Sequence, residues 1–241
     1  MPKPFPIFID GTRFRTARAL AKDIAERGEH CILPGRASSH PSDYYARWMR
    51  ADDSDATTAA ILEACALLID EDVSGDAWDH AVALTGSDGS EATILRVLER
   101  VEAADIPDAR WFGTGAEVAH RALIAVTYAI ETRMPNLRGR LAKLLEGCGD
   151  FYRAATLMLR GGVPDPAIVD LVGRWAKTCP IPSDQARTLA RRVRRYPPLV
   201  VPIAEALADA NDEARECFQA TIDEYAPDRS AEVAAVLSIT T

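Results

Sequence analysis

Aromatic residues and long apolar runs are scarce in this sequence of 241 residues, which holds 6 Phe, 6 Tyr and 4 Trp. No apolar run approaches the roughly 20 residues that a helix needs to cross a bilayer. The first residues, MPKPFPIFIDGTRFR, contain neither a long apolar segment nor a small-residue cleavage site, so no signal peptide is predicted. These absences predict a cytoplasmic protein without a membrane segment.

Cysteine and histidine give no sign of a disulfide framework or a metal site. No two cysteines form a C-x-x-C pair, and no histidine stands at ligand spacing from a cysteine or from another histidine. We therefore expect reduced, mostly buried thiols, no metal and no cofactor. The residues concerned are Cys31, Cys65, Cys148, Cys179 and Cys217, with His30, His40, His80 and His120.

Catalytic motifs are equally scarce. No phosphate-binding loop is present, and no G-x-G-x-x-G follows a strand. The turns GSDG (86–89) and GTG (113–115) precede predicted helices, where they would either bind an anion or serve as plain turns. Asp76 and His80, four residues apart, would share a helix face and either orient a catalytic base or pair structurally. An enzyme is therefore the least favoured function, and no catalytic residue is predicted.

Helical patterning dominates what is present, and it predicts an all-α fold. Alanine and leucine are frequent, and helices are expected over residues 16–27, 54–72, 77–84 and 116–133. Asp88 and Glu91 have capping-box spacing before another apolar-periodic run, ILRVLERV. No stretch is predicted to form a strand.

In the second half of the sequence, residues typical of helix N-termini recur at regular intervals. The candidate starts step by about 15 residues, so that pairs of short helices recur with a period of about 30. This half, residues 115–241, resembles HEAT-type or related α–α repeats, and the resemblance implies an α-solenoid preceded by an irregular helical half, residues 1–114. The candidate starts are Asn136, Asp150, Asp165, Ser183, Leu199, Asn211 and Asp228.

Charge is distributed unevenly along a chain whose net charge is −8. Residues 1–50 hold 9 basic and 5 acidic side chains, and residues 51–110 hold 3 and 15. Residues 111–200 hold 14 basic and 7 acidic side chains, and residues 201–241 hold 2 and 9. Such segregation predicts charged partners, or oppositely charged faces of the chain that attract each other.

The most concentrated basic feature is the stretch TLARRVRRYPPL (188–199). On one continuous helix, Arg187, Arg191, Arg194 and Arg195 would form a stripe opposite the apolar side chains. Because arginine makes bidentate contacts to carboxylate and phosphate, this stripe is a predicted binding surface. The alternative is a solvated face at a helix C-terminus, where cations also suit the helix dipole.

The acidic counterpart is formed by Asp70, Glu71, Asp72 and Asp76. Carboxylates at the end of a helix are unfavourable with respect to its dipole, so these residues are a second predicted binding surface, for a basic partner. The alternative is turn and capping chemistry, since many acidic residues of this segment lie near helix starts.

Two functions compete on these features. The first is a protein-binding module that uses a charged solenoid surface, in one specific form an immunity- or antitoxin-type inhibitor whose acidic surface covers a basic toxin. The second is a nucleic-acid-binding or base-excising helical-repeat protein that uses the basic residues of 111–200, with Trp175 stacking on a base. The negative net charge counts against the second, because phosphate contacts dominate nucleic-acid affinity.

Overall fold

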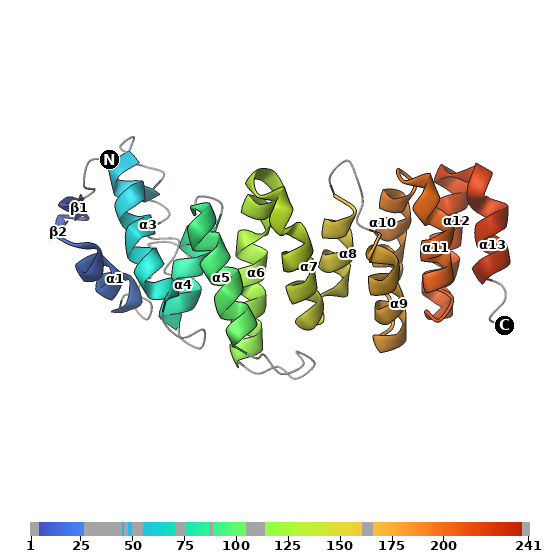
Figure 1. Ribbon diagram of the computed structural model, residues 1–241, viewed down its shortest axis with the longest axis horizontal. Coiled ribbons are helices and arrows are strands. Elements are labelled where there is room, and N and C mark those ends of the chain that lie inside the picture. The colour runs from blue at the N-terminus through green and yellow to red at the C-terminus, as the bar shows by residue number, and fades with distance from the viewer. Residues whose placement is uncertain are drawn as a thin grey trace, which may run out of the picture. The chain divides into compact units, whose positions relative to one another are not determined.

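The structure, a computed structural model, is helical apart from one two-stranded sheet in the residues it describes, which confirms the all-α prediction (Figure 1). The chain forms two compact units, Met1–Met134 and Pro135–Thr241. The predicted division at residue 115 stays a prediction. The described residues are 5–26, 45, 48–49, 55–70, 76–86, 89–104, 114–160 and 166–237.

The helices of the first unit pack against one another, and a small β-hairpin packs against two of them. α1 contacts α3 and α4, α3 also contacts α4 and α5, and α6 contacts α4 and α5. The hairpin rests on α1 and α3. Its elements are β1 (Ile7–Ile9), β2 (Thr12–Phe14), α1 (Ala17–Glu26), α3 (Asp55–Ile69), α4 (Asp76–Thr85), α5 (Glu91–Ala103) and α6 (Thr114–Arg133).

Side-chain hydroxyl groups accept hydrogen bonds from first-turn amides of α1 and α5 in this unit. The hydroxyl of Thr16 accepts a hydrogen bond from the Ala19 amide at 3.2 Å, in the first turn of α1. The predicted capping box before α5 is wrong, because the N-cap is Ser90, whose hydroxyl accepts from the Thr93 amide at 3.2 Å. Glu91 is thereby the first residue of the helix and not the third.

The hairpin corrects the expectation that no strand forms. Asp10 and Gly11 take φ angles of 49° and 74°, which is the two-residue turn that joins tightly paired antiparallel strands. Pairing places Phe8 opposite Arg13 on the outer face, with 63% of Phe8 exposed. Phe14 is only 6% exposed, because its face of the hairpin is turned toward the helices.

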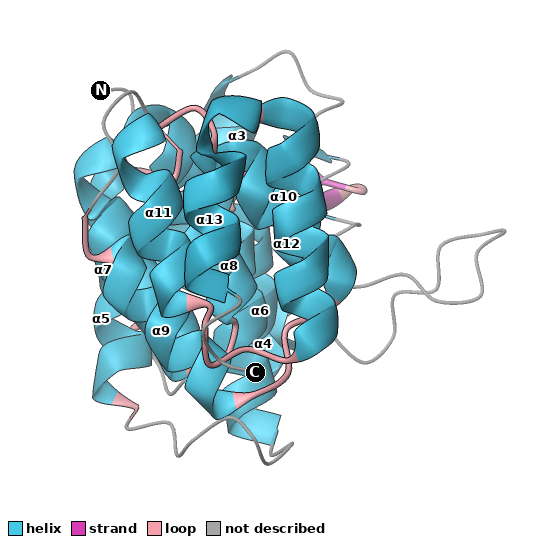
Figure 2. Ribbon diagram, turned by 90° about the vertical axis from the view of Figure 1, so that its right-hand side faces the viewer, coloured by secondary structure: helices cyan, strands magenta, loops and turns pink. Residues whose placement is uncertain are grey.

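The second unit arranges its helices in two rows of alternate members. α10 contacts α8 and α12, while α11 contacts α9 and α13. Figure 2 shows α10 and α12 on one side of this unit and α11 on the other. The elements are α7 (Arg138–Gly147) after a 3-10 turn (Pro135–Leu137), α8 (Phe151–Met158), α9 (Ile168–Thr178), α10 (Ser183–Val193), α11 (Pro197–Ala206), α12 (Asp212–Tyr225), and α13 (Ser230–Leu237) after a second 3-10 turn (Pro227–Arg229).

The predicted helix starts of this unit lie within a few residues of the observed ones. Asp150 caps α8, and its carboxylate accepts from the Arg153 amide at 3.0 Å. Asn211 occupies the N-cap of α12, but its side-chain oxygen accepts instead from the Ile181 amide at 2.8 Å, so it links neighbouring helix pairs. α11 begins two residues before the predicted Leu199, since its first two residues are prolines whose missing amide hydrogens cost nothing there.

The remaining starts differ more. Ser183 is the first residue of α10 rather than its cap, and its hydroxyl donates to the carboxylate of Glu213. Asp228 lies in the 3-10 turn that precedes α13. Asp165 falls outside the described residues.

The four described cysteines are free thiols, but they are less buried than predicted. Burial raises the pKa of the Cys65 thiol to about 12, which keeps it protonated and unreactive. Cys148 and Cys217 are half-buried, and Cys179, at the end of α9, is exposed.

Two glycines should respond in opposite ways to alanine. A Cβ on Gly89 would lie 2.3 Å from Cγ2 of Thr85 and 3.2 Å from its carbonyl oxygen, whereas a Cβ on Gly139, in α7, would meet no atom within 4 Å. We expect Gly89→Ala to lower the free energy of unfolding by about 1–3 kcal/mol through overpacking. Gly139→Ala should raise it by about 0.5 kcal/mol, because alanine loses less backbone entropy on folding. Urea titrations followed by circular dichroism measure both, and equal midpoints for the two variants would contradict the close packing at Gly89.

Candidate functional site

The acidic surface predicted at the end of α3 is described only at Asp70. Its carboxylate forms an ion pair with Arg96 of α5 at 3.3 Å, and its carbonyl oxygen accepts from Arg100. Glu71 and Asp72 lie outside the described residues, and of Asp76 only the backbone, which begins α4, is described. The described part of this surface is therefore engaged inside its own unit.

The predicted Asp76–His80 pair does not present an accessible base. His80 is only 5% exposed within α4. The acidic residue beside it, Asp79, is also buried and accepts from Arg121 of α6, at 3.0 Å from Nη2 and 3.4 Å from Nε. This bidentate pair joins α4 to α6. Among the described residues no group of histidine, cysteine and carboxylate side chains is arranged to hold a metal ion.

Gly89, the last residue of the turn GSDG, is hydrogen-bonded within its own unit. The Gly89 amide donates to the Thr85 carbonyl at 2.7 Å, and the Gly89 carbonyl accepts from Arg133 at 2.9 Å. That amide is therefore not available to an anion. Of the second turn, GTG, only its last two residues are described, and they begin α6.

The two tryptophans that the structure describes as buried, Trp78 and Trp175, are core packing residues. Trp175 is 3% exposed and its ring lies 6.4 Å from that of Tyr152, so it offers no face to a nucleic-acid base. Trp78 is buried and donates to the Ile69 carbonyl at 3.3 Å. Trp48 is half-buried, and Trp111 lies outside the described residues.

α10 carries the first half of the predicted arginine stripe because its apolar residues recur on one side. Arg187 and Arg191 stand one turn apart on the exposed face, and Arg192 is half-buried beside them. The buried face consists of Ala186, Leu189, Ala190 and Val193.

The second half of the stripe lies beyond the helix, which corrects the prediction of one continuous helical face. α10 ends at Val193, and Arg194 is its C-cap. Arg195 lies in the following turn, where its amide donates to the Arg192 carbonyl at 3.2 Å. The two prolines after Tyr196 explain the ending, since residues before proline avoid helical geometry.

Tyr225, the last residue of α12, joins the arginines to the neighbouring helix of the same row. The guanidinium carbons of Arg191 and Arg194 lie 5.4 Å and 4.7 Å from the centroid of its ring. Arg194 Nε also donates to the Arg191 carbonyl at 3.2 Å. The sequence analysis missed Tyr225, and the available signal was its position about one repeat period after the two arginines.

We call Arg187, Arg191, Arg194 and Arg195 the arginine surface. Within the part of the chain that the structure describes, none of its four members forms an ion pair with a carboxylate. Salt bridges between described residues of the second unit include Arg153–Asp150, Arg174–Glu146, Lys177–Asp209, Arg215–Asp212, Arg229–Asp228 and Arg229–Glu232.

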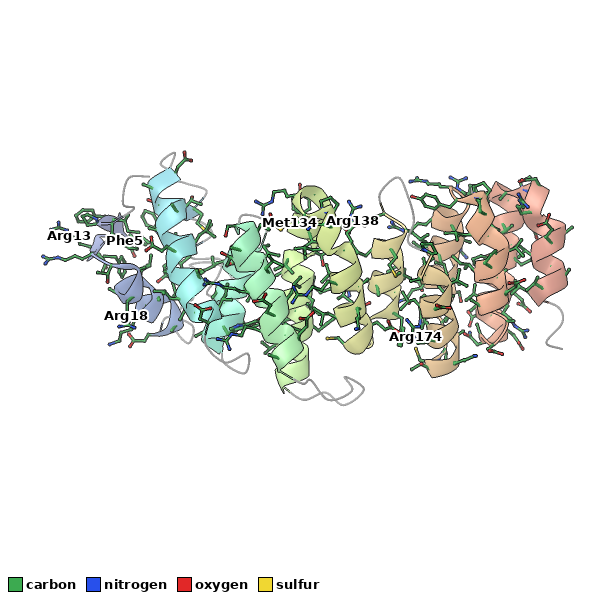
Figure 3. All side chains as sticks on the ribbon, in the orientation of Figure 1. Phe5, Arg13, Arg18, Met134, Arg138 and Arg174 are labelled. Atoms are coloured by element: carbon green, nitrogen blue, oxygen red, sulfur yellow. The ribbon has the colours of Figure 1, made fainter. Side chains whose placement is uncertain are left out.

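Arg174 illustrates the contrast with the arginine surface. It extends from α9 (Figure 3), and its Nε and Nη2 lie 2.5 Å and 3.0 Å from the two carboxylate oxygens of Glu146 on α7. Hydrogen bonding to this carboxylate raises the pKa of Arg174. A pocket of about 250 Å³ lies beside the pair, with Lys143 and Leu171 in its lining.

A larger pocket, of about 460 Å³, lies between α12 and α13 and is lined by polar side chains together with Ala220, Ala234 and Leu237. Arg215 pairs with Asp212 and donates to the Leu237 carbonyl at 3.2 Å. Gln219 donates to Asp223 at 2.6 Å. Two buried polar atoms of this pocket, Arg215 Nε and Gln219 Oε1, have no hydrogen-bond partner among the described residues. The arginine surface, which places several cations close together, is the stronger candidate for binding a charged partner.

No family model, curated protein or solved structure matches this chain. A separate finding concerns membranes: over the described residues, no helix has both the length and the apolar character required to span a bilayer. The geometry and charge of the arginine surface are therefore the features from which a function is inferred.

Proposed function

We propose that the protein is a helical-repeat module that binds another protein through the arginine surface, and that the partner presents clustered Asp and Glu side chains. The observation that carries the proposal is that four solvent-accessible arginines have no carboxylate partner among the described residues, whereas other arginines of the same unit, such as Arg174 and Arg215, form ion pairs. Like charges so close together repel one another, and an acidic partner would remove that repulsion. Arginine also suits bidentate contact to carboxylates.

The two rows of alternate helices support a solenoid for residues 135–241. Helices within each row follow one another at intervals of about 30 residues, as in stacked helix pairs. Contacts at both ends of α10 orient it parallel to α12: Ser183 meets Glu213 near the N-termini, and Arg191 meets Tyr225 near the C-termini. Parallel neighbours in a row are what repetition of one helix pair produces, and the resulting surface is extended enough for a protein partner.

Charge around the arginine surface favours a compact acidic patch over a nucleic acid. Asp184 lies one turn before Arg187, and Glu224 and Asp228 flank Tyr225 in the chain; all three carboxylates are exposed. A phosphate backbone, which is negative along its whole length, would meet these carboxylates. The buried Trp175 removes the aromatic side chain that the nucleic-acid hypothesis had assigned to base stacking.

An immunity- or antitoxin-type inhibitor is one specific form of this function. In the version predicted from the sequence, the acidic segment 51–110 covers a basic toxin. The only described side chain among its four candidate residues, Asp70, already pairs with Arg96. The arginine surface is accordingly the better supported contact face, and the inhibitor it implies would cover an acidic toxin surface.

Salt-dependent binding distinguishes a protein partner from a nucleic acid. We expect a fluorescently labelled alanine-based peptide, with a short cluster of glutamates flanked by uncharged residues, to bind at least about tenfold more tightly than a 20-base-pair DNA duplex at physiological ionic strength, because flanking carboxylates repel an extended polyanion. Fluorescence anisotropy titrations at several NaCl concentrations measure both affinities. Tighter binding of the duplex, with the steep salt dependence of several phosphate contacts, would instead support nucleic-acid binding.

A further inference from the structure

We infer that Tyr225 is a positioning residue of the contact site, and that it holds Arg191 and Arg194 ready for an acidic helical segment of the partner. The inference rests on the proposed function and goes beyond it, because it assigns a role to a residue on another helix and specifies the form of the partner. The ring lies within cation–π distance of both guanidinium groups, at 5.4 Å and 4.7 Å.

Stacking on an aromatic ring prepares an arginine for binding. A free arginine side chain loses considerable rotamer freedom when a partner fixes it, and this loss opposes association. Guanidinium groups already held over Tyr225 have lost part of that freedom before the partner arrives. The cation–π contact is made through the charge of the guanidinium group, so that N–H donors with no other bond remain available to a carboxylate.

The site keeps this arrangement accessible to a partner. Arg191 is exposed, and Arg194 and Tyr225 are half-buried at the ends of their helices. The hydrogen bond from Arg194 Nε to the Arg191 carbonyl fixes one edge of its guanidinium, which leaves the Nη groups for external contacts. The two arginines therefore form a prearranged pair and not two independent side chains.

The spacing of the arginines specifies the form of the partner. Arg187 and Arg191 are four residues apart on one helix face, so their Cβ atoms are separated by about 5–6 Å. Glutamates four residues apart on a partner helix have the same separation. A helix with Glu at such positions can thus pair with Arg187 and then with Arg191, which Tyr225 holds, in successive turns along α10.

Substitution of Tyr225 tests the role of the ring. The probe is a 20-residue alanine-based helical peptide with glutamate at every fourth position, and its glutamine counterpart is the peptide control. Loss of the aromatic face in Tyr225→Leu should weaken binding of the glutamate peptide about 5- to 20-fold, whereas Tyr225→Phe should change it less than about twofold. Tyr225→Trp, which offers a stronger cation–π face, should bind as well as the wild type or more tightly.

The outcomes separate this inference from the proposed function. Unchanged affinity in Tyr225→Leu, together with lost binding in the double variant R187E/R191E, would overturn the role of Tyr225 and leave the arginine surface in place. Equal weakening by Phe and Leu would also overturn it, since the hydroxyl would then matter and not the ring. If Tyr225→Leu does not fold, weaker binding by a folded Tyr225→Trp contradicts the inference. Binding of the glutamate peptide that R187E/R191E leaves unchanged would overturn both.

Discussion

The double variant R187E/R191E should bind the acidic peptide at least about 30-fold more weakly than the wild-type protein. Each substitution removes a charge-assisted contact and places a carboxylate against the acidic partner, so that lost attraction and new repulsion add. Both side chains are exposed, and neither forms an ion pair within the described residues, so the fold should be retained. Isothermal titration calorimetry at constant ionic strength measures the affinity.

The matched control is K143E/K177E, which makes the same change in net charge on α7 and α9. Lys143 and Lys177 are exposed, and within the described part of the chain their one ion pair, Lys177 with Asp209 at 3.5 Å, is a solvent-exposed contact of small energetic value. We expect this control to weaken binding less than about threefold, through long-range repulsion alone. Similar losses in the two double variants would mean that net charge, and not the arginine surface, attracts the peptide.

Truncation of Phe14 should lower the free energy of unfolding of the first unit by about 3 kcal/mol, because a buried aromatic ring leaves a cavity between the hairpin and the helices. Phe8→Ala is the matched control, since it makes the same substitution on the opposite face of the same hairpin. Phe8 is 63% exposed and loses only the stacking of Arg13 at 5.9 Å, which predicts a change below about 1 kcal/mol.

Native-state hydrogen exchange can measure both phenylalanine variants within the first unit. The slowest amides in the buried parts of α1 and α3, such as those of Leu20, Ile24 and Ile61, report its free energy of opening. Larger protection losses in Phe8→Ala than in Phe14→Ala would show that the strands are paired in a different register from Phe8 with Arg13 and Phe14 with Ile7.

Helix positions were predictable because they depend on local and periodic properties. The apolar spacing in 54–72 and 116–133 matches α3 and α6 to within about three residues, the usual uncertainty at helix ends. Asp150 was correctly identified as a cap because a carboxylate at an N-cap acts within its own first turn. The hairpin was missed although Asp10-Gly11, between IFI and TRF, carries the strongest short-range hairpin signal.

The candidate site was predictable only in part. Arg187 and Arg191 follow from the periodicity of α10, but the end of the helix at Val193 places Arg194 and Arg195 in a different geometry. Tyr225 lies on another helix, and only the tertiary packing of α10 on α12 brings its ring to the arginines. The engagement of Asp70 by Arg96 is likewise a contact between helices that local sequence patterns do not encode.

The most direct test of the account follows the arginine side chains themselves during binding. Arginine Nε–Hε resonances of the isotopically labelled protein can be recorded by NMR while the glutamate peptide is added. The account predicts chemical-shift changes concentrated at Arg187, Arg191, Arg194 and Arg195, with ring resonances of Tyr225 moving in parallel, and no comparable change at Arg174, whose donors already bind Glu146. Changes centred on other arginines, or none at the arginine surface when the peptide is bound, would contradict it.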